Sequence, residues 1–141
     1  MEIADLLGCW SLVAAYQDKG GTIGPNPFIG ENPTGYLHYL SEGRVAVTIA
    51  LAGRKPYSVE NRRLAPIDEL AASALTFDAY AGTYRFLEAG IIAHHIEIST
   101  CQNEVGQDLV RRIVLEDDRL TLYPVLPDGV DMRWLVWRRV S

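Results

Sequence analysis

Polar side chains that could bind or protonate a small oxygen-containing molecule lie in the second half of the sequence. The candidates for chemistry are Tyr80, Tyr84, His94 and Arg111. An imidazole can move a proton near neutral pH, a phenol can hold a carbonyl oxygen, and a guanidinium can stabilise developing negative charge. These groups suit a cofactor-independent isomerase or cyclase. They equally suit a carrier in which they only orient a carboxylate or carbonyl ligand.

The alternation of residue types predicts which of these side chains share an interior. Successive strand residues point to opposite faces, and the more apolar set of each strand should face the core. The sets predicted to face inward contain Asp78, Tyr80, Tyr84, Phe86, His94 and Arg111. A register error of one residue would reverse every side chain. In that case the site residues would be His95, Glu97 and Arg112.

Each candidate also has a purely structural interpretation. Arg111 can form an ion pair with Asp78, because buried charges persist only when they are paired or hydrogen-bonded. His94 and the two tyrosines can be ordinary residues of the wall. Their convergence in an otherwise apolar interior nevertheless favours a binding pocket. The further candidates for contact with a ligand are Phe28, His38, Asp78, Phe86 and Trp137.

The histidines argue against a metal site. The sequence has three, His38, His94 and His95, and adjacent strand residues point to opposite faces, so His94 and His95 cannot share an ion. A haem would need one inward histidine, which His94 or His38 could supply, but no other feature marks a porphyrin site. No glycine-rich phosphate loop is recognisable. We therefore expect no metal and no cofactor.

Eight strand-like stretches must position these side chains. They are rich in β-branched and aromatic residues and are separated by turn signals, including Pro127-Asp128-Gly129. The predicted strands are 8–17, 34–40, 44–52, 77–87, 91–100, 108–115, 119–126 and 132–140. Closure into a barrel removes the exposed edges of such a sheet. The sequence therefore predicts an all-β, eight-stranded antiparallel up-and-down barrel, wide enough for side chains and one small ligand.

Three segments lie outside these strands. Residues 2–7 have apolar residues at helical spacing, which predicts a short N-terminal helical plug. Repeated Gly and Pro in 18–33 predict a long loop without a regular strand, whose apolar tip, Phe28 and Ile29, could close a cavity mouth or pack outside. A helix is predicted over 66–75, with its apolar stripe against the barrel.

Length and composition indicate an ordinary globular protein. The 141 residues suit one domain, 1–141, with 48% hydrophobic and 22% charged residues. A net charge of −5 with scattered basic residues argues against nucleic acid as a partner. No apolar run is long enough for a membrane span. The acidic N-terminus and the unpaired Cys9 and Cys101 indicate a cytoplasmic protein, and a homodimer is left open.

Several motifs resemble a known family. Gly8-Cys9-Trp10 in the first strand, preceded by a helical plug and answered by Arg138 or Arg139 in the last, resembles the lipocalin superfamily. We expect one of these arginines to lie over the Trp10 ring, because the first and last strands pair when a barrel closes. More closely, the chain resembles the short bacterial and fungal lipocalin-like domain family through Leu7-Gly8-Cys9-Trp10-Ser11-Leu12-Val13, Pro33-Thr34-Gly35-Tyr36-Leu37-His38-Tyr39, Gly43-Arg44, Tyr80-Ala81-Gly82-Thr83-Tyr84, His94-His95-Ile96-Glu97, Arg119-Leu120-Thr121-Leu122 and Leu135-Val136-Trp137-Arg138-Arg139.

The resemblance implies a barrel with an internal cavity, and some similar barrels in biosynthetic pathways act as cyclases or isomerases without cofactors. The expected function is binding of a small, largely apolar or aromatic metabolite with a carbonyl or carboxylate, with or without its isomerisation. The alternatives are a non-catalytic carrier and a structural domain with a filled core. A filled core predicts no cavity of ligand size.

Overall fold

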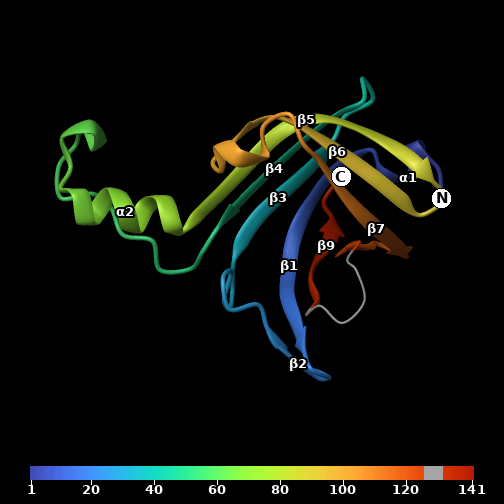
Figure 1. The fold of residues 1–141 in the computed structure, drawn as a ribbon, viewed down its shortest axis with the longest axis horizontal. Coiled ribbons are helices and arrows are strands. Elements are labelled where there is room, and N and C mark those ends of the chain that lie inside the picture. The colour runs from blue at the N-terminus through green and yellow to red at the C-terminus, as the bar shows by residue number, and fades with distance from the viewer. Residues whose placement is uncertain (126–131) are drawn as a thin grey trace.

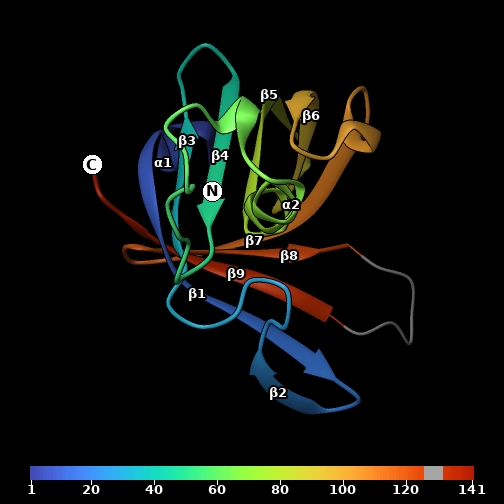
Figure 2. The same cartoon turned by 90° about the vertical axis from the view of Figure 1, so that its left-hand side faces the viewer.

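The strands close into one antiparallel barrel, as the sequence predicts. The computed structural model describes residues 1–125 and 132–141, so the predicted turn at 127–129 lies outside the described residues. The barrel strands are β1 (Gly8–Lys19), β3 (Thr34–Tyr39), β4 (Arg44–Ala50), β5 (Phe77–Glu88), β6 (Ile91–Ser99), β7 (Asp108–Glu116), β8 (Arg119–Pro124) and β9 (Met132–Arg139). Neighbours in sequence pair in order, and β1 pairs with β9 to close the barrel (Figures 1 and 2).

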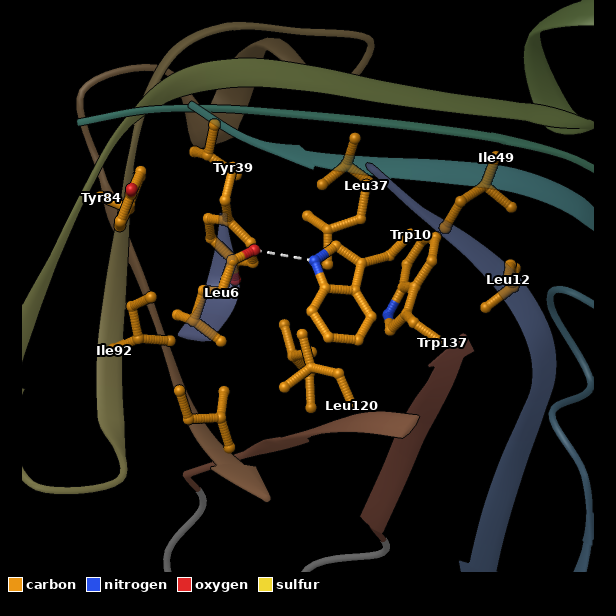
Figure 3. Packing of buried hydrophobic residues seen from close by; sticks show 14 of the residues in the cluster. Leu6, Trp10, Leu12, Leu37, Tyr39, Ile49, Tyr84, Ile92, Leu120 and Trp137 are labelled. Carbon is orange, nitrogen blue, oxygen red and sulfur yellow. Dashed lines mark hydrogen bonds between the residues drawn. The ribbon is translucent and has the colours of Figure 1, made fainter. Parts of the chain in front are cut away.

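One end of the barrel is sealed by the predicted helical plug. Helix α1 (Ile3–Leu6) places Leu6 beside Trp10, and both side chains are fully buried. The Trp10 indole donates a hydrogen bond of 2.9 Å from Nε1 to the Leu6 carbonyl oxygen (Figure 3). Arg139 lies over the Trp10 ring, which confirms the predicted contact and selects Arg139 rather than Arg138. Around them pack the other buried apolar residues, among them Leu12, Leu37, Tyr39, Ile92, Leu120 and Trp137.

The segment 18–33 contains a strand that the sequence analysis did not predict. Strand β2 (Thr22–Pro25) pairs with the end of β1 in an antiparallel hairpin outside the barrel. Its turn is Gly20-Gly21, where both residues have positive φ, as a two-residue hairpin turn with type I′ geometry requires. Pro25 ends this edge strand, a position where proline is tolerated. The prediction of a long loop without a regular strand was therefore wrong for Thr22–Pro25.

The predicted helix is present, but its position was wrong. Helix α2 (Ile67–Leu75) follows a short 3₁₀ helix, η1 (Arg62–Leu64), in an excursion between β4 and β5. This excursion projects to one side of the barrel instead of lying against it (Figure 1). Ile67 and Leu75, members of the predicted apolar stripe, are 84% and 81% exposed. None of the helices in the described residues has the length and apolar character needed to cross a membrane.

Candidate functional site

A cavity of about 320 Å³ lies within the barrel, near the end that the 18–33 segment partly covers. This volume is at the lower end of the range of small-molecule sites, roughly 300–1,000 Å³. Its apolar wall comes from four barrel strands and from the covering segment: Ile29, Leu37, Val47, Ile49, Leu122, Leu135 and Trp137. The polar side chains in the wall are Asn26, Tyr80, Arg111 and Arg133. The filled-core interpretation, which requires no such space, does not fit this interior.

Arg111 brings a half-buried positive charge to the cavity. Its Nη1 donates a hydrogen bond of 2.9 Å to the carbonyl oxygen of Val110. Among the residues that the structure describes, it forms no ion pair, and Asp78, its predicted partner, is exposed. The structural Arg111–Asp78 pair is therefore not what holds the guanidinium. Its remaining N–H donors are available to a ligand.

Other polar groups of the wall also present hydrogen-bond donors. Asn26 is buried, and its Oδ1 already accepts bonds from the backbone N–H groups of Phe28 (2.9 Å) and Ile29 (3.2 Å). Only its NH₂ group is left for a ligand. Trp137 Nε1 is a buried donor without a partner among the described residues. The described lining includes no acidic side chain.

Tyr80 is the outer member of a buried chain of three hydrogen-bonded side chains, with His94 and Tyr39 behind it. The ring of His94 is fully buried, and each of its nitrogens contacts one phenol. The distance from His94 Nε2 to the Tyr39 hydroxyl is 2.7 Å, and that from Nδ1 to the Tyr80 hydroxyl is also 2.7 Å. Tyr39 comes from β3, Tyr80 from β5 and His94 from β6. Three strands therefore converge on one polar chain that ends at the cavity wall.

Burial keeps all three of these groups neutral at physiological pH. Removal from water and, to a lesser extent, the nearby charge of Arg111 together lower the pKa of His94 to about 3. Burial raises the pKa of Tyr39 and of Tyr80, although Arg111 opposes the increase at both. His94 is therefore uncharged at neutral pH, with one ring nitrogen as donor and the other as acceptor.

The structure brings together some of the predicted site residues. Tyr80, Arg111 and Trp137 line the cavity, and His94 reaches it through Tyr80. Tyr84 also faces inward, but its hydroxyl donates a bond of 2.9 Å to the Leu40 carbonyl oxygen, away from the cavity lining. Phe86 packs against the same core from a partly buried position. The functional roles of these residues stay predictions.

Four predicted ligand-contact residues are absent from the cavity lining, namely Phe86 and the exposed residues His38, Asp78 and Phe28. His38 is exposed on the outer face of β3, because Leu37 and Tyr39 take the inward positions of that strand. Asp78 is exposed at the start of β5. Phe28 is 66% exposed and its ring lies 4.6 Å from the guanidinium carbon of Arg133. Its neighbour Ile29, not Phe28, closes over the cavity.

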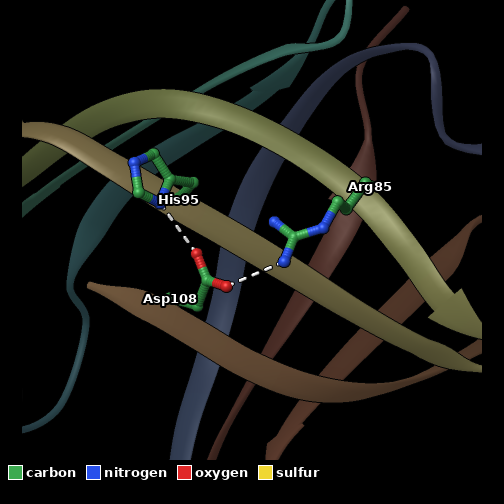
Figure 4. A network of polar contacts seen from close by, with 3 residues as sticks. All are labelled: Arg85, His95 and Asp108. Carbon is green, nitrogen blue, oxygen red and sulfur yellow. Dashed lines mark hydrogen bonds and ion pairs between the residues drawn. The ribbon is translucent and has the colours of Figure 1, made fainter. Parts of the chain in front are cut away.

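The residues that would have replaced these candidates after a register error lie on the outside of the barrel. His95 Nδ1 contacts Asp108 at 2.8 Å, and Asp108 also pairs with Arg85 at 2.8 Å (Figure 4). Glu97 pairs with Arg44, and Arg112 lies over the Tyr123 ring. The His95–Asp108 and Arg112–Tyr123 contacts join adjacent strands, whereas the Arg85–Asp108 and Arg44–Glu97 pairs each reach across an intervening strand on the outer surface. The predicted inward orientation of His94 in β6 and of Arg111 in β7 is confirmed.

Sequence reasoning missed Tyr39, Asn26 and Arg133. Alternation in 34–40 could have found Tyr39, because Gly35, Leu37 and Tyr39 form the less polar set. No comparable pattern marks Asn26, whose position depends on the turn after β2. Arg133 lies at the cavity rim, where it contacts Gln17 through a bond of 3.1 Å.

Comparison with known proteins gives one positive result. The family model described as a lipocalin-like domain matches residues 7–140, which is nearly the whole chain. A search of the curated proteins finds no significant match. The matched span contains every barrel strand and the complete described lining of the cavity.

Proposed function

The chain belongs to the lipocalin-like domain family, and from this premise we propose that it binds one small, largely apolar or aromatic molecule carrying a carboxylate or carbonyl group inside the barrel. The observation that carries the proposal is the half-buried Arg111 guanidinium in a largely apolar cavity, without an ion-pair partner among the described residues. A guanidinium presents several N–H groups in a planar arrangement that matches a carboxylate. The apolar wall would receive the rest of the ligand.

Binding is better supported than catalysis by His94. A group with a pKa of about 3 is a weak base at neutral pH, and general bases work best when their pKa lies near the operating pH. A cofactor-free isomerase or cyclase would therefore depend on Tyr80 and Arg111 at the cavity wall. Turnover of a candidate substrate would distinguish such an enzyme from a carrier.

Arg111 offers a direct test with a matched control in the next residue. The probe is 2-naphthoate, a flat aromatic carboxylate, with binding measured by calorimetry. Loss of a charge-assisted hydrogen bond in Arg111→Met should weaken affinity about tenfold to a hundredfold. Arg112→Met removes an equal charge from the outer surface and should leave affinity unchanged. Equal affinities of the two variants, or no binding by the native protein, would refute the proposal.

A further inference from the structure

Hydrogen bonds along the buried Tyr39–His94–Tyr80 chain run in one direction, from donor to acceptor. This direction follows from the environment of Tyr39 at the inner end of the chain. Tyr39 is 1% exposed, and among the described residues its hydroxyl contacts no hydrogen-bond partner except His94 Nε2. If Nε2 carried the ring proton, it would donate to the Tyr39 oxygen. The Tyr39 hydroxyl proton would then be buried without an acceptor, which is costly.

The opposite arrangement satisfies the Tyr39 hydroxyl and both ring nitrogens of His94. Tyr39 donates its proton to His94 Nε2, so the ring proton of the neutral imidazole lies on Nδ1. Nδ1–H then donates to the Tyr80 oxygen, 2.7 Å away. The Tyr80 oxygen acts only as an acceptor in this chain, so the Tyr80 hydroxyl proton is free to donate elsewhere. Because Tyr80 lines the cavity, that proton can point toward a ligand.

We propose that the Tyr39–His94 pair makes Tyr80 a hydrogen-bond donor to the bound molecule, so that the site selects ligands with an acceptor oxygen beside Tyr80. This inference rests on the proposed function, and it makes Tyr80 a specificity-determining residue and His94 a positioning residue. Arg111, Trp137 Nε1 and the Asn26 amide also supply donors. A ligand that presents an N–H or O–H at this wall would lack a partner there.

The charges around the chain keep this direction fixed over a wide pH range. Arg111 faces it from β7, and its positive charge disfavours protonation of His94. Glu104, which follows β6, influences Tyr80 more weakly than Arg111 does. Among the described residues, Tyr84 also lies near the chain, and its hydroxyl donates a hydrogen bond to the Leu40 carbonyl oxygen. A single neutral tautomer should therefore persist through neutral pH.

The first test measures the His94 tautomer in the full-length protein without ligand. Nitrogen-15 chemical shifts of the imidazole distinguish a protonated from an unprotonated ring nitrogen. His38→Gln and His95→Gln, both substitutions of outward-facing residues, assign the remaining signals to His94. We expect a protonated Nδ1 and an unprotonated Nε2 at pH 7. A protonated Nε2 would overturn the inference, whatever the protein binds.

The second test compares two neutral probes of the same shape, 2-acetylnaphthalene and 2-isopropenylnaphthalene. Only the first has an acceptor oxygen, so the native protein should bind it more tightly. Tyr80→Phe should reduce this preference about fivefold to tenfold, the value of one hydrogen bond. An unchanged preference in Tyr80→Phe would also overturn the inference, while normal 2-naphthoate binding would leave the proposed function intact.

The positioning role of His94 has its own control. A glutamine at this position has an amide oxygen that can accept from Tyr39 and an NH₂ group that can donate to Tyr80. His94→Gln should therefore retain the preference for 2-acetylnaphthalene, and His94→Leu should lose it. Equal preferences in these two variants would contradict the positioning role. If either variant fails to fold, the tautomer measurement on the native ring still decides the question.

Discussion

The guanidinium carbon of Arg139 lies 4.2 Å from the centroid of the Trp10 ring, so the last strand of the barrel covers an indole of the first. The same guanidinium donates a bond of 2.8 Å to the Leu7 carbonyl oxygen and a second bond to the Asp5 carbonyl oxygen. One side chain therefore joins the plug helix, β1 and β9. The Arg139 guanidinium therefore supports both the pairing of β1 with β9 and the attachment of helix α1 to the barrel.

Arg139→Met should lower the free energy of unfolding by about 2 kcal/mol, because it removes a cation–π contact and two hydrogen bonds to backbone carbonyls. Urea denaturation monitored by tryptophan fluorescence measures this change. Arg138→Met is the control, since Arg138 is exposed and lies 4.0 Å from Asp118. It should change stability by less than about 0.5 kcal/mol. Similar losses in both variants would show that closure does not depend on Arg139.

Trp10→Ala should be among the most destabilising single changes, at about 3–5 kcal/mol, because the indole is fully buried. Trp10→Phe keeps most of the apolar contact but removes the hydrogen bond from Nε1 to the Leu6 carbonyl. It should cost about 1–2 kcal/mol. Urea midpoints of the two variants check the order. A phenylalanine variant as unstable as the alanine variant would assign the main role to the hydrogen bond.

Gly82→Ala should disrupt the pairing of β5 with β6. The register shifts between Ala81 and Gly82, and a Cβ atom at Gly82 would lie 1.8 Å from the His95 carbonyl oxygen. Because the obstructing atom belongs to the backbone, no side-chain rotation relieves the overlap, and we expect a loss of roughly 3 kcal/mol or more. Gly24→Ala, where nothing lies within 4 Å of the new Cβ, should be nearly neutral. Thermal unfolding of both variants tests the contrast.

His94 should make the protein less stable in acid. Its pKa falls from 6.5 to about 3 on folding, so between these values the unfolded chain binds a proton that the folded chain does not. The free energy of unfolding should therefore decrease as the pH falls through this window, by a total on the order of 4 kcal/mol.

Carboxylates such as Asp108, whose pKa is lowered by hydrogen bonds from Arg85 and His95, contribute to acid instability as well. The measurement is therefore the difference between the native protein and His94→Gln, each unfolded in urea at several pH values. The native protein should lose more stability than the variant between pH 6.5 and pH 3. Parallel curves would mean that His94 titrates normally in the folded state.

The sequence predicted the strands and most inward faces because both depend on local alternation. Ile92, His94 and Ile96 share one parity in β6, and burial of the two isoleucines carries the histidine inside. The same rule, applied to 34–40, would have excluded His38. Alternation fails near strand ends, where Ile98 has the inward parity but is 67% exposed.

Other features depended on contacts between distant segments. The amphipathic pattern of 66–75 indicates which face a helix could bury, but it does not reveal whether a partner surface is present. The cavity mouth depends on the turn after β2, where Asn26 bonds to its own loop. The Tyr39–His94–Tyr80 chain joins three strands at separations that no local motif encodes.

The excursion that carries α2 leaves and re-enters the barrel at one point. Ala50 pairs with Phe77, and the Leu51 N–H donates a bond of 2.9 Å to the Thr76 carbonyl oxygen. In terms of chain connectivity, β4 and β5 are therefore an ordinary hairpin whose loop has been enlarged. The entropy of closing such a loop varies only slowly with its length. We therefore expect that a short turn or a foreign domain could replace residues 52–75 without altering the path of the barrel.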